Sequence, residues 1–342
     1  MNRRLYLVAA AALAVIAGVS VYVATTVEPK DIAQTGDLQV IQESVPSVTA
    51  AKGWINSAPL TKSDLAGKVV IFDFWTYSCV NCQRTIPHLK ALYDRYKTDG
   101  LLIIGVHSPE FDFEKDHENV ARGVEHYGVT WPVALDDDMA IWNAFSNQYW
   151  PAEYFTDRQG RLRQVRFGEG DYDSKENDVR TLLGLPSDAP RAAPAGSDPV
   201  LTAALTPEIH FGLAFGGASF NASPEKSTKG TQTYSLPDPL PQDTYALQGS
   251  WAITDQGAEA PDGGVFVLRY RGAEVNLVAG AGSSPITVTV ELDGAPLTTL
   301  TVMDHDLYHV VTDGPSGYHT LTFRPQTAGL QAFAFTFGAG TK

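Results

Sequence analysis

Both cysteines of this 342-residue chain lie in one stretch, Phe74-Trp75-Thr76-Tyr77-Ser78-Cys79-Val80-Asn81-Cys82-Gln83-Arg84. Residues 69–75 (VVIFDFW) lead into it as a nearly continuous apolar run, which is typical of a strand buried on both faces of a parallel sheet. Residues 82–97 follow with apolar side chains at helical spacing. The stretch therefore predicts a Cys-x-x-Cys pair where a buried strand passes into a helix.

This position predicts different chemical roles for the two sulfur atoms. Cys79 would lie in the first helical turn, where unpaired N–H groups and the helix dipole stabilise a thiolate. Cys82, one turn along, would be close enough to attack a mixed disulfide formed on Cys79. A zinc site completed by His88 and His107 and an inert structural disulfide stay open as alternatives. Haem attachment is excluded because Gln83 stands where a histidine is needed. We favour a redox-active pair with no metal and no cofactor.

The residues after the pair continue in alternation. A second buried strand at 101–106 completes a strand–helix–strand unit with a right-handed crossover. The pattern then predicts helices at 113–127, 138–145 and 177–183, a strand at 131–135, and a hairpin of 153–156 with 161–167. This order over residues 51–185 predicts an α/β thioredoxin fold with an inserted helix.

The rest of the chain has a different pattern. Residues 186–200 are rich in proline and alanine and predict a semi-rigid linker. Residues 201–342 contain short apolar runs separated by turns, without helical periodicity, which predicts an all-β sandwich. Its aromatic side chains could stack on a sugar or fill the core, and the candidates are Tyr234, Tyr245, Trp251 and Tyr308.

The N-terminus predicts export. Arg3 and Arg4 precede an uncharged run at residues 5–27, which at 1.5 Å per residue is long enough to cross a hydrocarbon core of about 30 Å. We expect residues 1–27 to be a membrane anchor and 28–50 a polar spacer, with the domains outside the cytoplasm. A cleaved signal, which would make the protein secreted, is the alternative.

Composition narrows the function classes. The net charge of −14, without a basic stripe, excludes nucleic acid as a partner. With 44% hydrophobic and 19% charged residues the chain is not disordered. Its two cysteines exclude a disulfide-stapled scaffold.

Residues 75–84 (WTYSCVNCQR) resemble the active site of the TlpA-like thioredoxins, and most closely the exported thioredoxin-like part of DipZ-type proteins. The segments 105–110 (GVHSPE), 147–153 (NQYWPAE), 167–172 (FGEGDY), 249–252 (GSWA) and 333–338 (FAFTFG) also resemble the DipZ pattern. The resemblance covers nearly everything after residue 50. It implies a jelly-roll, carbohydrate-binding-module-like sandwich for residues 201–342. It departs at the front, where DipZ-type proteins carry a multi-helix membrane electron transporter.

The resemblance implies roles for residues around the dithiol. Asp73 matches a buried acid that takes the proton from Cys82 as that thiol attacks; capping of a local backbone group is the alternative. Trp75 matches a tryptophan packed beside the disulfide.

Three further residues match the pattern. Pro151 matches a proline that follows a cis peptide bond and faces the cysteines, exposing the backbone of Trp150 for strand-like pairing with a substrate. Glu110 matches an acid near the disulfide that tunes the thiol pKa values, and a solvated loop carboxylate is its alternative.

Together these observations predict an extracytoplasmic thiol–disulfide oxidoreductase. We expect it to reduce disulfides of exported proteins through Cys79 and Cys82, with a CcdA-type membrane protein as the electron donor. An oxidase or isomerase that forms disulfides is the second hypothesis, and Val80-Asn81 between the cysteines does not decide between them. The third is a glycan-binding surface protein in which the thioredoxin fold is a spacer.

Overall fold

The computed structural model describes residues 38–195, 205–261 and 263–340. The anchor expected at residues 1–27 lies outside this part of the chain. Among the described residues no helix combines the length and the apolar character needed to cross a membrane.

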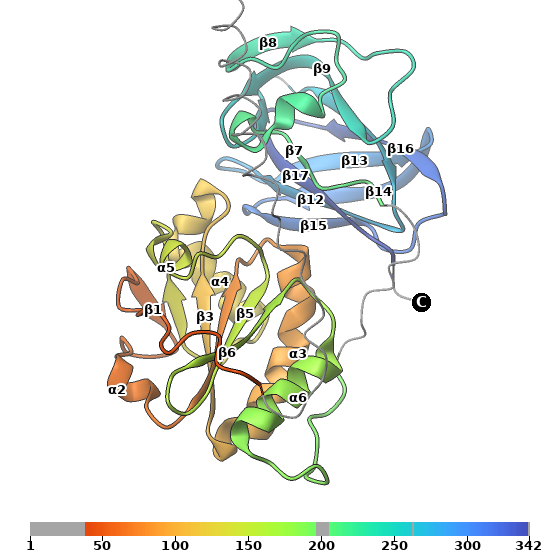
Figure 1. Ribbon diagram of the computed structural model, residues 1–342. Coiled ribbons are helices and arrows are strands. Elements are labelled where there is room, and N and C mark those ends of the chain that lie inside the picture. Colours follow the sequence, from red (N-terminus) through yellow and green to blue (C-terminus); the bar gives the residue numbers. More distant parts are fainter. Residues whose placement is uncertain (1–37, 196–204, 262, 341–342) are drawn as a thin grey trace, which may run out of the picture. The chain divides into compact units, whose positions relative to one another are not determined.

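Residues 53–167 contribute a six-stranded sheet in the order β1-β4-β3-β2-β5-β6 (Figure 1). The strands are β1 (Gly53–Ile55), β2 (Val69–Trp75), β3 (Leu101–His107), β4 (Val133–Leu135), β5 (Ala152–Thr156) and β6 (Leu162–Phe167). Strands β2, β3 and β4 run parallel, whereas β1, β5 and β6 pair antiparallel with their neighbours. All residues of β2 and β3 are buried, as expected of central strands covered on both faces.

Successive side chains of β2 point to opposite faces and enter two separate cores. On one face, Val69, Ile71 and Trp75 pack with α3 (Val80–Tyr96), α4 (His117–His126) and α6 (Tyr172–Leu183). On the other face, Val70, Phe72 and Phe74 pack with α5 (Ala140–Ala144). A short helix, α2 (Lys62–Leu65), precedes β2. This arrangement confirms the predicted thioredoxin fold.

The predicted helix at 113–127 is divided. A 3-10 turn (Asp112–Lys115) comes first, and α4 begins only at His117. The interruption is Asp116, whose backbone is extended and whose carboxylate accepts the Glu118 N–H at 2.8 Å as an N-cap.

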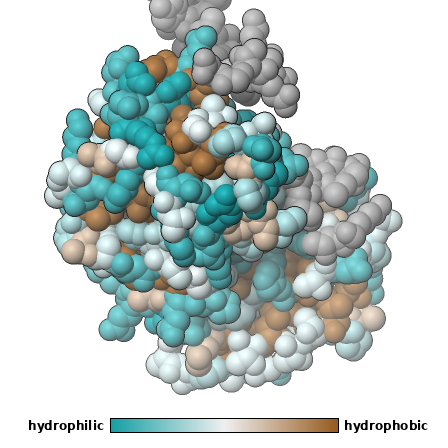
Figure 2. Space-filling model, turned by 90° about the horizontal axis from the view of Figure 1, so that it is seen from below, coloured by the Kyte–Doolittle hydropathy of each residue, from teal (hydrophilic) through white to brown (hydrophobic). Residues whose placement is uncertain are grey.

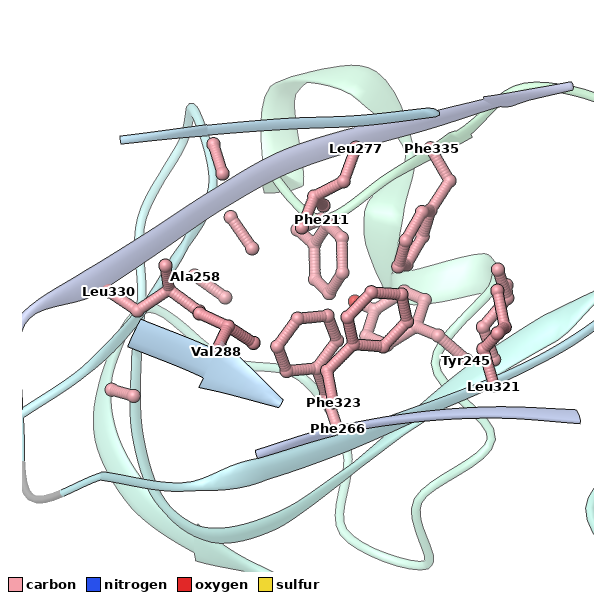
Figure 3. Close-up of a cluster of buried hydrophobic side chains, with 14 of the residues drawn as sticks. Phe211, Tyr245, Ala258, Phe266, Leu277, Val288, Leu321, Phe323, Leu330 and Phe335 are labelled. Atoms are coloured by element: carbon pink, nitrogen blue, oxygen red, sulfur yellow. The ribbon is translucent and has the colours of Figure 1, made fainter. Parts of the chain in front are cut away.

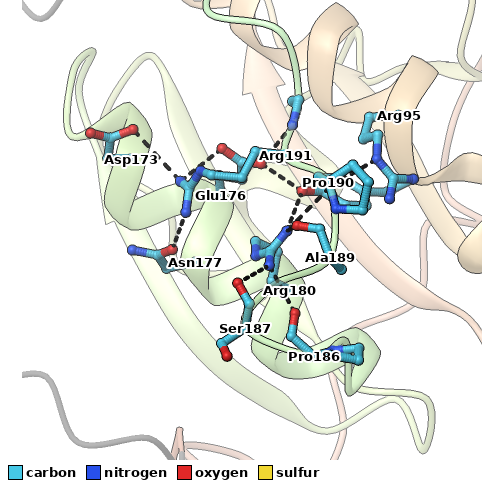
Figure 4. A network of polar contacts seen from close by, with 12 residues as sticks. Arg95, Asp173, Glu176, Asn177, Arg180, Pro186, Ser187, Ala189, Pro190 and Arg191 are labelled. Carbon is cyan, nitrogen blue, oxygen red and sulfur yellow. Dashed lines mark hydrogen bonds and ion pairs between the residues drawn. The ribbon is translucent and has the colours of Figure 1, made fainter.

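We call described residues 38–195 the thioredoxin part. The described residues of the predicted spacer and of the predicted linker, at its two ends, both contact the rest of it. In the expected spacer, the Ile41 N–H donates to the Leu162 carbonyl at 2.8 Å, and Val48 is buried. In the expected linker, Arg180 of α6 donates to the carbonyls of Pro186, Ser187, Ala189 and Pro190 (Figure 4). Residues 196–200 lie outside the described part.

Residues 205–340, called here the C-terminal sandwich, contain only strands and short 3-10 turns among their described positions. The strands are β7 (Ile209–His210), β8 (Gly230–Tyr234), β9 (Thr244–Ile253), β10 (Ala258–Ala260), β11 (Val265–Arg271), β12 (Glu274–Gly280), β13 (Ile286–Leu292), β14 (Ala295–Val302), β15 (Asp306–Val311), β16 (Tyr318–Pro325) and β17 (Leu330–Gly338). Their order is β14-β13-β16-β11-β9-β10-β17-β12-β15, with β7 on β17 and β8 on β9.

Strand β9 belongs to both halves of this sheet. Its first residues pair with β11, and its last pair with β8 and β10. Gly249, at the change, has φ 92°, which side chains disfavour. The two halves enclose an aromatic core in which the rings of Phe266 and Phe323 stack 4.5 Å apart (Figure 3). The predicted sandwich is confirmed.

The aromatic residues considered as sugar platforms lie mostly in this core. Tyr234, Tyr245 and Trp251 are at most 2% exposed, so their faces are not available to a glycan. The face seen in Figure 2 is mainly hydrophilic, with hydrophobic residues in small groups between polar ones.

Candidate active site

The two cysteines differ in exposure. Cys79 is the N-cap of α3 and is half-buried, whereas Cys82 is 1% exposed. The Cys82 N–H donates to Sγ of Cys79 at 3.2 Å, so this sulfur occupies the position of a helix-capping acceptor. A partner can therefore reach Cys79, while Cys82 can act only from inside.

The surroundings of Cys82 keep it protonated. It packs in the same apolar cluster as Trp75 and Ile86. Burial raises the pKa of Cys82 well above its ordinary value, and the hydrogen bond with Cys79 and the charge of Asp73 add to this. Its conversion into a nucleophile therefore requires a base.

Asp73 is the buried acid on the adjoining strand. It is 2% exposed, and its Oδ1 has no hydrogen-bond partner, so the structure shows no backbone capping at that atom. Burial raises the pKa of Asp73 well above its ordinary value, and the negative charge of Glu153 raises it further. Asp73 is therefore held as a neutral acid next to the dithiol.

A buried ion pair adds to the effect of burial on Asp73. Glu153 lies opposite Asp73 in the β2–β5 register, and its Oε1 is 2.7 Å from Nζ of Lys175 on α6, both side chains being 1% exposed. One buried cation thus faces two buried carboxyl groups: it contacts Glu153, and its charge lowers the pKa of Asp73 by less than burial and the charge of Glu153 raise it. Sequence reasoning missed Lys175, which lies before the helix predicted at 177–183, whereas α6 already begins at Tyr172.

Of the other predicted site residues, Trp75 lies in the core, whereas Trp150 and Pro151 directly precede β5. Trp75 is buried, with its ring edge-on to His107 at 5.5 Å. The Trp150–Pro151 peptide bond is cis. The indole N–H of Trp150 donates to the Ser108 carbonyl at 3.0 Å, which holds this ring beside the loop after β3.

His88 and His107 are engaged away from the cysteines. His88 stacks on Tyr172 at 4.6 Å, and His107 is 3.3 Å from the Thr76 hydroxyl. Burial lowers the pKa of His107 to about 3. Among the described residues these histidines form no ligand cluster with Cys79 and Cys82, so the zinc arrangement is not assembled.

Glu110 is not a solvated loop carboxylate. Its side chain is 16% exposed, and its Oε1 is 2.9 Å from Nε2 of His210 in the C-terminal sandwich. Burial alone would lower the pKa of His210, but the hydrogen bond with Glu110 and the charges of Glu110 and Glu208 outweigh burial and raise it. Glu110 is therefore an ion-paired carboxylate.

Glu114 is a site residue that sequence reasoning missed. It is fully buried, and the Ser78 hydroxyl donates to its Oε1 at 2.5 Å. The N–H groups of Glu110 and Phe111 donate to its Oε2 at 2.6 and 2.9 Å. Glu114 thus ties the residue before Cys79 to the segment after β3. One sequence signal was available. Glu114 lies three residues after Phe111, the N-cap of the 3-10 turn, and this is the position that the acid takes in a capping box.

Glu114 makes stability depend on pH. Burial, together with the charge of Glu110, raises the pKa of Glu114 to about 7. A carboxyl pKa that is higher in the folded state stabilises the fold at low pH, and this contribution is lost as pH rises through about 7. We expect the free energy of unfolding to fall by about 3 kcal/mol more in wild type than in Glu114→Gln between pH 4.5 and 8. Urea unfolding at both pH values measures this, and equal changes in the two proteins would contradict it.

A cavity of about 200 Å³ opens beside Cys79. Six of its lining residues belong to the thioredoxin part, namely Ser78, Cys79, Val80, Asn81, Glu110 and Trp150. The others, Thr206, Glu208, Val278, Thr336 and Phe337, belong to the C-terminal sandwich. The predicted residues Cys79, Glu110 and Trp150 thus meet at one cavity, while Cys82, Asp73 and Trp75 lie in the interior behind it.

Both halves of the chain match known families. Residues 41–165 match the AhpC/TSA family, and residues 206–338 match a family described as thioredoxin like C-terminal domain.

Similar proteins match one or both halves. DipZ of Mycobacterium tuberculosis is 38% identical over 311 residues, which are 86% of this chain and 43% of DipZ. The chain thus spans less than half the length of that relative. The thiol-disulfide oxidoreductase YkuV of Bacillus subtilis is 30% identical over 144 residues, which are 42% of this chain and 96% of YkuV. A solution structure of a thioredoxin-like protein in the oxidized form is 30% identical with a TM-score of 0.39, covering 42% of this chain and 96% of that one.

Proposed function

We propose, because this chain belongs to the thioredoxin-like thiol–disulfide oxidoreductases, that it reduces disulfide bonds of proteins outside the cytoplasm through Cys79 and Cys82. One observation carries this proposal: a half-buried thiol at a helix N-terminus stands next to a fully buried thiol and a buried acid. These are the nucleophile, the resolving group and the base that thiol–disulfide exchange needs.

The first step takes place at Cys79. Its thiolate attacks one sulfur of the substrate disulfide, which forms a mixed disulfide and releases the first substrate sulfur as a thiolate. That thiolate takes a proton from water. At the N-cap position the Cys82 N–H donates to Sγ of Cys79, which orients the attacking sulfur.

The second step takes place inside. Asp73, in its ionised form, takes the proton of the Cys82 thiol, and the resulting thiolate attacks Sγ of Cys79. The second substrate thiolate leaves, and the Cys79–Cys82 disulfide forms. Two electrons pass from the enzyme dithiol to the substrate disulfide, so an external donor must reduce the enzyme again.

The acidic surroundings support the direction of reduction. A strong oxidase is one whose reduced form is stabilised, commonly as a thiolate near positive charge. Here the cavity beside Cys79 is lined by Glu110 and Glu208, and the imidazole of His210 is paired with Glu110. None of the described residues that line this cavity is a lysine, arginine or histidine, so the lining brings no positive charge that would stabilise the reduced form, and this supports the reductase over the oxidase or isomerase.

Location and electron supply belong to the same proposal. The uncharged run at residues 5–27 after two arginines supports placement at the outer face of the cell membrane. A membrane electron carrier of the CcdA type would then supply the electrons. No glycan partner is proposed, because three of the four candidate rings are in the sandwich core.

The reduction potential of the Cys79–Cys82 couple tests the direction. Equilibration of the full chain with glutathione or dithiothreitol, followed by thiol trapping, measures it. We expect a value below about −220 mV, towards that of thioredoxin at about −270 mV. A value above about −160 mV, towards the strong oxidases, would reject the reductase and establish the oxidase as the working hypothesis.

A further inference from the structure

Val80, which directly follows Cys79, is covered by the C-terminal sandwich. Val80 is 5% exposed and shares an apolar cluster with Phe111 and with four residues of the sandwich, Val278, Leu307, Phe333 and Ala334. This contact therefore places the sandwich directly against the start of α3.

Polar contacts fix the same position. Arg84, two residues beyond Cys82, forms ion pairs with Glu169 of the thioredoxin part and with Glu274 of the sandwich. The Tyr77 hydroxyl, two residues before Cys79, donates to the His305 carbonyl at 3.0 Å. Contacts of this kind on both sides of the dithiol hold the sandwich as a fixed neighbour of Cys79.

The cavity that remains is small. Its volume of about 200 Å³ is below the range of roughly 300–1,000 Å³ typical of pockets for drug-sized ligands. Trp150 lines it from the thioredoxin part, and Val278, Thr336 and Phe337 line it from the sandwich. A space of this size holds a cysteine residue with its immediate backbone, but not the surface of a folded domain.

We propose that the C-terminal sandwich is one wall of the substrate site, so that Cys79 receives its disulfide partner as a single extended segment lying between this wall and Trp150. Glu208 is exposed at the cavity and lines the path of that segment. The inference rests on the proposed function, because it assigns a substrate form to the same dithiol. It makes residues 206–208 and strands β12 and β17 determinants of specificity, although the thiols themselves belong to the thioredoxin part.

Filling the cavity with a bulky side chain tests whether the C-terminal sandwich is a wall of the substrate site. In the full-length Glu208→Trp variant, a glutathione mixed disulfide on a short unstructured peptide should react about tenfold more slowly than in wild type, because a displaced segment loses its alignment with Cys79. Hydroxyethyl disulfide, which needs no groove, reports any change in the reactivity of Cys79 itself, so the ratio of the peptide rate to the hydroxyethyl disulfide rate should fall about tenfold. Glu225→Trp is the matched control, because Glu225 is a partly exposed acid of the sandwich that does not line the cavity. Release of glutathione or mercaptoethanol measures the rates.

The outcomes separate the two proposals. A selective loss with the peptide in Glu208→Trp, absent from Glu225→Trp, supports the wall. No loss with the peptide, or an equal loss with hydroxyethyl disulfide, overturns it. Wild-type chain should also react at least about tenfold faster with the unstructured peptide than with the same glutathionylated cysteine on a folded protein, and equal rates overturn the wall as well. Failure of reduced wild-type chain to react with hydroxyethyl disulfide would reject the proposed function itself.

Discussion

Replacement of Cys79 by serine is expected to lower the rate of thiol–disulfide exchange at least about a thousandfold, because a serine hydroxyl is not ionised near neutral pH and is a poor nucleophile. The half-buried position of Cys79 makes it the sulfur that a partner can reach, and Cys82 is 1% exposed. The buried thiol therefore cannot take over the attack.

The matched variant is Cys82→Ser. It should carry out the first step at close to the wild-type rate and then stop at a mixed disulfide, because the resolving sulfur is missing. Stopped-flow release of the first product thiol and mass spectrometry of the adduct measure both effects. Turnover by Cys79→Ser, or an adduct that forms on Cys82 instead of Cys79, would contradict the assigned roles.

Asp73→Asn is expected to slow the second step about a hundredfold, the lower end of what a positioned general base contributes. In wild type the rate of this step should increase as pH rises, since the pKa of Asp73 is raised by burial and only the ionised carboxylate accepts the proton of Cys82. The asparagine variant should lose this increase. Release of the second product from a preformed mixed disulfide, followed between pH 5 and 9, measures the profile.

Glu153→Gln distinguishes a base from a merely structural acid. Removal of the Glu153 charge leaves Lys175 without its partner at 2.7 Å and exposes Asp73 to that positive charge. The pKa of Asp73 should fall, so the increase in rate should move to lower pH. Asp188→Asn, at an exposed position, is the control and should leave the profile unchanged. A wild-type profile in Asp73→Asn would show that another group accepts the proton.

The dithiol and its immediate support were predictable because their signals are local in sequence. The apolar run 69–75 places Asp73 and Trp75 on the same face of one strand, since both lie an even number of residues from Val69. The three-residue spacing of Cys79 and Cys82 brings the Cys82 N–H to Sγ of Cys79 within one helical turn. Matching motifs added Glu110, Trp150 and Pro151. The boundaries that differed depend on single caps such as Asp116.

The sequence by itself thus determined the thioredoxin fold, the all-β half and the chemistry of the two sulfur atoms, because periodicity and motif spacing record contacts between residues close in the chain. Only the tertiary structure decided three further contacts. Lys175 pairs with Glu153 beside the buried Asp73, and Ser78 donates a hydrogen bond to Glu114. The C-terminal sandwich bounds the cavity at Cys79. Lys175 and Glu153 are 22 positions apart in the sequence, and Ser78 and Glu114 are 36 positions apart. Arg84 and Glu274, which join the thioredoxin part to the sandwich, are 190 positions apart. No local pattern encodes such pairings, since each depends on which surfaces the folded chain brings together.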